Sequence, residues 1–182
     1  NRNALKSISA QKAKTVYKKG ETLNTNDITV TANRQDGVTE KITDFQVDAQ
    51  GIDMNTYGKK TIKVTYQEDN FIRTANVEIA VAQLSLKSTL SLKKGKSQTL
   101  TATVNPAGLK VQWSSDKTSV ATVDQNGKVT GKANGTAYIT AKAGAVTAKC
   151  KVTVTTDVSS VKLDKTKLTM KVGEKKKLKA TV

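Results

Sequence analysis

The sequence has no histidine, one cysteine, one proline and few aromatic residues, and each shortage narrows the functions it can perform. Without histidine the chain lacks the commonest general base and a usual ligand of zinc and copper. The lone Cys150 excludes an internal disulfide framework and a cysteine-rich metal site. The lone Pro106 excludes a polyproline stalk. No apolar run approaches the roughly 20 residues that a membrane-spanning helix needs.

Positive charge, in contrast, is abundant and unevenly spread. The 31 lysines and arginines against 15 acidic residues give a net charge of +16 over 182 residues. Residues 1–82 carry 12 basic and 10 acidic residues (+2), residues 83–156 carry 11 and 2 (+9), and residues 157–182 carry 8 and 3 (+5). A segment at +9 attracts polyanions. It has no arginine, however, which argues against the bidentate contacts of base-specific nucleic-acid recognition.

The lysines gather at turns, in two clusters that admit three interpretations. One cluster is Lys93, Lys94 and Lys96, and the other is Lys175–Lys177. Solvated faces and protection of strand edges are the favoured interpretation. Attraction to anionic wall polymers or host glycans is the second. Nucleic acid is the third and weakest, because Tyr138 and Trp113 are the only aromatic residues of the central segment and form no stacking platform.

An internal repeat organises the second half of the chain. The stretch from Leu84 to Val104 returns in the stretch from Val161 to Val182, with one gap of a single residue. Six positions match at a constant spacing of 78 residues, namely Leu90, Leu92, Gly95, Leu100, Ala102 and Val104 with Leu168, Met170, Gly173, Leu178, Ala180 and Val182. We therefore predict units at 1–82 (its core beginning near Leu5), 83–156 and 157–182. The last covers only about three strand signals, too few for a closed core.

Alternation of apolar and polar residues predicts strands along almost the whole chain. The apolar sets are Ile62, Val64 and Tyr66; Val77, Ile79 and Val81; and Ala148, Cys150, Val152 and Val154. Each set predicts an antiparallel strand with one packed and one wet face. Asp36-Gly37, Asn126-Gly127 and Asn134-Gly135 supply the turns between strands. The pattern indicates an all-β sandwich, with Leu92, Leu100, Val104, Trp113, Val123, Ile139 and Val152 in the core of the unit at 83–156.

The glycine-rich stretch DQNGKVTGKANGT (Asp124–Thr136) suggests a phosphate-binding loop at first sight. A phosphate loop of the Walker type needs two glycines four residues apart, followed by Lys and Ser or Thr, at the start of a helix. Here Gly127 and Gly131 are three residues apart, Lys132 precedes Ala133, and a strand pattern follows. The stretch is therefore predicted to be a hairpin with a turn at Asn126-Gly127.

The remaining candidate residues favour structural roles. Cys150 lies on the apolar side of its strand, where cysteine acts as a small hydrophobe. Trp113 is predicted to pack in the core, with stacking on a sugar as the alternative. Asp124 and the region around Glu68-Asp69 are candidate calcium ligands, but neither place shows the spaced carboxylates of a calcium loop. We predict no catalytic, cofactor-binding or metal-binding residues, and no residue is assigned to a ligand.

The stretch from Trp113 to Ala141 resembles the group 2 bacterial immunoglobulin-like domain of the invasin and intimin kind. The likeness rests on Trp113-Ser114-Ser115, Val120–Val123, Gly127, Val129–Gly131 and Gly135–Ala141, and upstream on Leu90, Leu92, Gly95, Leu100, Ala102–Val104 and Pro106. The start of this pattern recurs at 157–182. Residues 5–82 are similar to a group 3 domain, through Val16–Ala32 and Tyr57–Tyr66, although they lack the WSS signature.

This resemblance implies tandem immunoglobulin-like antiparallel β-sandwiches and a role without catalysis. The expected function is a structural or adhesive module, a spacer or stalk, in a multi-domain bacterial extracellular or cell-surface protein. Anionic wall polymer or glycan is its candidate contact, with no cofactor and no membrane insertion of this segment. The alternatives are a decoration or tail module of a phage virion, and an accessory module of a secreted polysaccharide or peptidoglycan hydrolase. Because the chain starts at Asn1 without a signal peptide, we expect it to be part of a longer protein.

Overall fold

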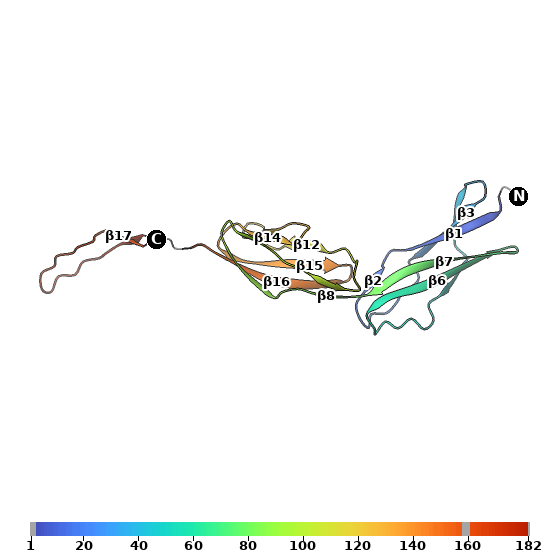
Figure 1. The fold of residues 1–182 in the computed structure, drawn as a ribbon, viewed down its shortest axis with the longest axis horizontal. Coiled ribbons are helices and arrows are strands. Elements are labelled where there is room, and N and C mark those ends of the chain that lie inside the picture. The colour runs from blue at the N-terminus through green and yellow to red at the C-terminus, as the bar shows by residue number, and fades with distance from the viewer. Residues whose placement is uncertain (1–2, 158–160, 182) are drawn as a thin grey trace.

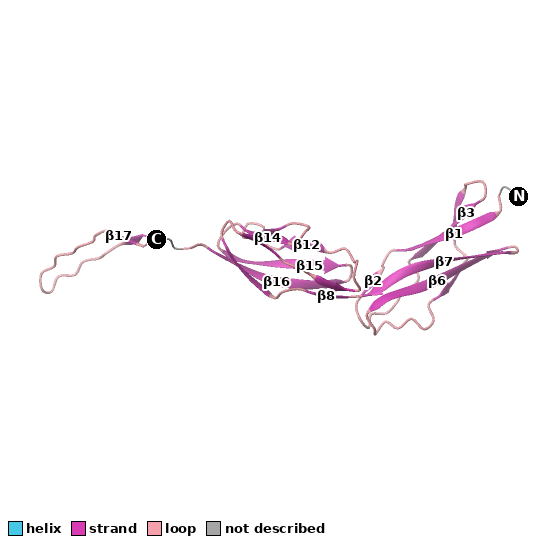
Figure 2. Ribbon diagram, in the orientation of Figure 1, coloured by secondary structure: helices cyan, strands magenta, loops and turns pink. Residues whose placement is uncertain are grey.

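The computed structural model describes residues 3–157 and 161–181, which form strands and no helix. None of these residues therefore forms a helix that could cross a membrane. Two β-sandwiches lie end to end along the longest axis of the molecule (Figure 1), and strands make up their layers throughout (Figure 2). The repeat position Val182 lies outside the described residues.

The first sandwich packs two sheets, β1-β3-β4 and β2-β7-β6-β5, around one apolar core. The predicted alternation is confirmed here, since Ile62, Val64, Val77 and Ile79 are buried and the residues between them are exposed. The Asp36-Gly37 turn joins β3 to β4, as predicted. The strands are β1 (Leu5–Lys12), β2 (Val16–Tyr17), β3 (Ile28–Arg34), β4 (Thr39–Ile42), β5 (Gln46–Asp48), β6 (Gly58–Glu68) and β7 (Phe71–Val81).

The second sandwich packs the sheet β12-β15-β16-β9 against the sheet β10-β14-β13, with the pair β11-β8 beside them. Its inner face is lined by small residues as well as large ones, because Ala137, Ala141 and Cys150 are fully buried with Ile139. The strands are β8 (Gln83–Ser85), β9 (Thr89–Lys93), β10 (Ser97–Thr99), β11 (Thr103–Asn105), β12 (Gln112–Ser115), β13 (Ala121–Val123), β14 (Lys128–Gly131), β15 (Gly135–Ala143) and β16 (Val146–Thr155).

The predicted all-β antiparallel class is confirmed, and each sandwich adds one parallel pairing. The last strand of the first sandwich, β7, pairs in parallel with β2, and the last strand of the second, β16, pairs in parallel with β9. Alternation shows which residues face the core but does not tell which strand is a neighbour or in which direction it runs. These two pairings therefore had no local signal in the sequence.

The predicted core of the second sandwich is confirmed at Leu92, Leu100, Ile139 and Val152, which are buried. Three other predicted core residues are half-buried. Trp113 and Val123 pack on the same core, whereas Val104 packs against a separate apolar cluster where the two sandwiches meet. The prediction of a single core thus missed that Val104 belongs to the joint.

Residues 161–181 form only two short strands, β17 (Lys162–Leu163) and β18 (Ala180–Thr181), and expose their apolar side chains. The pairing of Lys162 with Thr181 corresponds, at the repeat-equivalent positions, to that of Ser85 with Thr103 in the second sandwich. Side chains that are buried in the second sandwich are open here, as Met170 and Leu178 are 45% and 47% exposed. This segment has no counterparts of β15 and β16 to cover them.

A buried lysine was not expected from the alternating pattern. The side chain of Lys12 is fully buried at the end of β1, where its ammonium group pairs with Asp27 and lies 5.5 Å from the centre of the Tyr17 ring. Burial lowers the pKa of Lys12, but the hydrogen bond to the Asp27 carboxylate and the neighbouring Tyr17 outweigh it, so that the net pKa is raised. The same ammonium group lowers the pKa of Asp27.

We expect the two members of this pair to respond differently to removal. Asp27→Ala leaves a buried, unpaired charge and should cost about 2 kcal/mol, less than the 3–5 kcal/mol of a fully buried pair because Asp27 still contacts water. Lys12→Met keeps an apolar stem in place and should cost less than about 1 kcal/mol. Calorimetry of the whole chain measures both. Equal losses of stability in the two variants would show that the unpaired charge of Lys12 is not the reason why Asp27→Ala is destabilising.

Candidate functional site

The place where the two sandwiches meet is closed by apolar contact and has no flexible linker. Strand β7 ends at Val81, β8 begins at Gln83, and Ala82 between them is 2% exposed. Ala82, Ala143 and Val146 form a buried cluster. Half-buried side chains from both sandwiches pack on it, namely Val16, Leu84, Val104, Leu109 and Val111. The joint is thus both short and packed.

A tight turn of the second sandwich lies directly on the first. Ala143 pairs with Val146, so Gly144 and Ala145 form a two-residue hairpin loop between β15 and β16. Gly144 has a φ of +57°, and Ala145 is not among the described residues with positive φ. Glycine at the first loop position is typical of a type II′ turn, which suits the twist of a hairpin.

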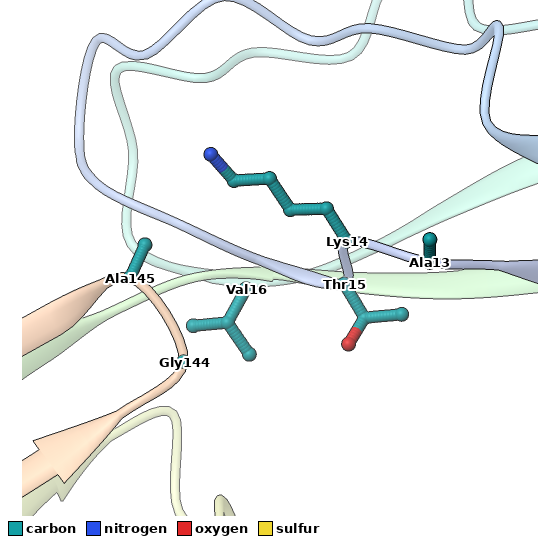
Figure 3. Close-up of a pocket in the computed structure, with 6 residues that line it drawn as sticks. All are labelled: Ala13, Lys14, Thr15, Val16, Gly144 and Ala145. Atoms are coloured by element: carbon teal, nitrogen blue, oxygen red, sulfur yellow. The ribbon is translucent and has the colours of Figure 1, made fainter.

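Gly144 is in contact with Val16, and no larger residue would fit between them. A Cβ atom built at position 144 would overlap the Cβ of Val16 and lie 2.9 Å from each of its γ-methyl groups. Figure 3 shows the Val16 side chain beside the Gly144 turn. This contact joins residues far apart in the sequence, so the local sequence pattern around either residue did not predict it.

Backbone hydrogen bonds hold Val16 in this place. The amide of Ala80 donates to the carbonyl of Thr15 at 2.8 Å, and the amide of Ala82 donates to that of Tyr17 at 2.9 Å. Just before them, the amide of Lys14 donates to the Asp27 carboxylate at 3.0 Å. Val16 is therefore fixed to β7 on both sides, so that the surface meeting Gly144 is rigid.

Two open pockets flank the joint, and neither has the residues of a reaction centre. One, of about 360 Å³, is lined by Ala13–Val16 with Gly144 and Ala145 (Figure 3). The other, of about 380 Å³, contains Lys18, Lys19 and Tyr57, and the ammonium group of Lys19 lies 5.5 Å from the centre of the Tyr57 ring. Neither pocket is lined by a carboxylate, and the ammonium group of Lys14 in the first pocket pairs with Glu21.

The glycine-rich stretch Asp124–Thr136 forms the predicted hairpin. Val123 pairs with Val129, and β13 and β14 run antiparallel on either side of the Asn126-Gly127 turn. The Asp124 carboxylate accepts hydrogen bonds from the amides of Asn126 and Lys128, at 2.8 and 2.9 Å. Its oxygens therefore stabilise the turn. No helix follows, so the dipole and amides of a phosphate loop are missing from this part of the chain.

The other residues considered as candidate sites pack or pair with neighbouring residues of the fold. Trp113 is half-buried against the core, and its ring packs over Gly127, where an added Cβ would lie 2.9 Å from Cζ2. Glu68 pairs with Arg34. Among residues 3–157 and 161–181 no three histidine, cysteine or acidic side chains gather as a metal site would require. Lys93, in the first lysine cluster, pairs with Asp157 at 2.5 Å.

Cys150 is fully buried, as predicted, and burial raises the pKa of its thiol. Because the thiolate is the reactive form, we expect an aromatic disulfide reagent to react at least about a hundredfold more slowly with the folded chain than with the chain in guanidinium. Absorbance of the released thiolate measures both rates. Equal rates would mean that the strand opens readily.

The fold and the joint define a class of protein, the tandem of immunoglobulin-like β-sandwiches. Residues 10–81 match the family model "Bacterial Ig-like domain (group 3)", and residues 80–154 match "Bacterial Ig-like domain (group 2)". The chain therefore belongs to the bacterial immunoglobulin-like domains, with one domain of each group in tandem, as the sequence motifs predicted. Both groups are families of non-catalytic modules.

Individual relatives match only in part. Lacto-N-biosidase of Bifidobacterium bifidum is 49% identical over 71 residues, which are 37% of this chain and 6% of that protein. Among solved structures, domains 4 and 5 of the S-layer protein SbsC align over 68% of this chain and 89% of theirs (24% identity, TM-score 0.38). A C-terminal fragment of intimin, solved with the intimin-binding domain of its receptor Tir, aligns over 88% and 67% (18% identity, TM-score 0.44).

Proposed function

We propose that this segment is a structural or adhesive spacer in a multi-domain bacterial extracellular or cell-surface protein. The observation that carries the proposal is the closed joint, in which Gly144 packs on Val16 and Ala82 is buried. A packed joint limits bending, so successive sandwiches hold a distal domain at a fixed distance. Membership of two non-catalytic families supports the same role.

The proposed spacer includes the start of a further group 2 domain. Residues 157–182 begin another group 2 domain, and their strand pairing in the register of β8 and β11 supports this assignment. The net charge of +9 on residues 83–156 supports contact with an anionic wall polymer or glycan as the second part of the function.

Nuclear magnetic relaxation of backbone amides tests the spacer. We expect both sandwiches of the 1–182 chain to tumble as one elongated body. Separate, faster tumbling of each sandwich would contradict the proposal.

Antibody labelling of intact cells tests the location. Labelling at the cell surface supports a surface protein, and recovery with phage particles would instead place the segment in a virion.

The segment similar to Lacto-N-biosidase favours one further candidate, an accessory module of a secreted polysaccharide or peptidoglycan hydrolase. Mass spectrometry of the native protein would detect a hydrolase domain.

A further inference from the structure

The outer face of the sheet β12-β15-β16-β9 differs from the rest of the surface in its side chains. The inward residues of β15 and β16 are buried, so the alternate residues face solvent. Lys142, Lys149 and Lys151 are exposed there around Tyr138, which is 43% exposed. The other outward positions within the four strands carry serine, threonine or glutamine, apart from Lys93 at the edge, and none of them is acidic. They are Thr89, Ser91, Lys93, Gln112, Ser114, Thr136, Thr140, Thr147, Thr153 and Thr155.

The strand register places the three lysines and the tyrosine side by side. Tyr138 is paired with Lys151, and Thr140 is paired with Lys149. Directly opposite side chains in a sheet are about 5 Å apart at Cβ, and diagonal ones about 7–8 Å. Lys149 therefore lies diagonal to both Tyr138 and Lys142, and the lysines form a row with steps of about 7 Å.

Within the described part of the chain, no ion pair involves the three lysines of this row. Lys93 at the edge, in contrast, pairs with Asp157. The second sandwich has only two acidic residues. Asp124 is bonded within its turn. Asp116, just beyond β12, stands opposite Tyr138 in the register of β12 and β15 and borders this face, but its carboxylate accepts a hydrogen bond from the amide of Tyr138 at 2.7 Å and pairs with none of the three lysines.

The corresponding sheet of the first sandwich, β2-β7-β6-β5, shows the contrast. There Asp48 is paired directly with Lys63 across the strands. Glu78 stands opposite Thr61 and accepts a hydrogen bond from its hydroxyl group at 2.7 Å. On this sheet of the first sandwich, carboxylates thus lie beside the lysines. An uncompensated basic row is a property of the second sandwich and not of the shared fold.

We propose that this face, centred on Tyr138, Lys142, Lys149 and Lys151, binds a linear acidic polysaccharide. The proposal specifies the polymer contact in the function proposed above and rests on it. Lysine ammonium groups on flexible stems adapt to anions of different geometry. The exposed ring of Tyr138 offers an apolar surface to a sugar ring, and the surrounding hydroxyl groups both donate and accept hydrogen bonds, as sugar hydroxyls do. A single aromatic residue without arginine fits a nucleic acid less well.

The test compares two triple variants of equal charge in the 1–182 chain. Lys142, Lys149 and Lys151 are changed to glutamine in one, and Lys117, Lys128 and Lys132 in the other, which are exposed lysines outside this face. Each variant lowers the net charge from +16 to +13. Fluorescence of Trp113 during unfolding confirms that both are folded. The probes are polygalacturonate, neutral dextran and single-stranded oligo-thymidine, and the measurement is calorimetric affinity.

We expect the face variant to bind polygalacturonate about tenfold more weakly or worse, and the control variant to lose less than about threefold, because nearby charges dominate the local potential. Tyr138→Ala should weaken binding about fivefold through lost apolar contact, and Tyr138→Phe should not. Equal losses in both triple variants, or tighter binding of oligo-thymidine, would overturn the proposal. Absence of binding would also overturn it, while the common tumbling of the sandwiches would still report separately on the spacer.

Discussion

Alanine at position 127 should destabilise the second sandwich by about 3 kcal/mol. Gly127 has a φ of +80°, a conformation that costs other residues roughly 1–2 kcal/mol. The added Cβ would also overlap the carbonyl oxygen of Leu100 and press on the ring of Trp113, and overpacking of this kind costs roughly 1–3 kcal/mol. For a domain of this size, about 3 kcal/mol lowers the melting temperature by roughly 12–24 °C.

Tryptophan fluorescence measures this loss in one sandwich alone, because Trp113 is the only tryptophan of the chain. Gly108 provides a matched control. It has a φ of +89° in the same sandwich, but a Cβ there meets nothing within 4 Å. Gly108→Ala should therefore cost only the backbone strain, roughly 1–2 kcal/mol. Equal losses at both positions would show that the packing of Trp113 and Leu100 over Gly127 contributes nothing.

The role of Gly127 shows what the sequence could and could not predict. The Asn126-Gly127 dipeptide predicted the hairpin because glycine tolerates positive φ, and β13 and β14 confirm it. That the same glycine also makes room for Trp113 depends on a contact across the sandwich. Local patterns carry information about turns and faces, whereas contacts between distant segments appear only when the sheets are assembled.

The same limit explains the differences elsewhere in the fold. Alternation located Cys150 correctly on the inner face, but it carries no signal for the buried Lys12, because the burial depends on a contact with Asp27 from another segment. Val104 had an apolar pattern like that of Leu100, yet it packs at the joint because it lies at the end of the sandwich. Composition indicated a basic second sandwich, but only the register of β15 and β16 places Tyr138 among its lysines.

At the joint, we expect Gly144→Ala to uncouple the motions of the two sandwiches. Its Cβ would overlap Val16, whose backbone is held in place by the hydrogen bonds of Thr15 and Tyr17 to Ala80 and Ala82. The hairpin loop must therefore move away, which separates Ala143 and Val146 from Ala82 and opens their apolar cluster to water. Amide relaxation should change from one common tumbling time to a shorter, separate time for each sandwich, with both cores intact.

Backbone strain contributes to this variant as well, since Gly144 has a φ of +57° and alanine there costs roughly 1–2 kcal/mol. Two further variants separate strain from contact. Gly37→Ala places alanine in another hairpin turn at positive φ, with nothing within 4 Å of its Cβ, and should leave the common tumbling unchanged. Val16→Gly combined with Gly144→Ala removes the overlapping side chain and should restore common tumbling in part, a coupling that independent sites would not show. If the double variant stays as uncoupled as Gly144→Ala alone, overlap with the Val16 side chain is not the cause of the uncoupling.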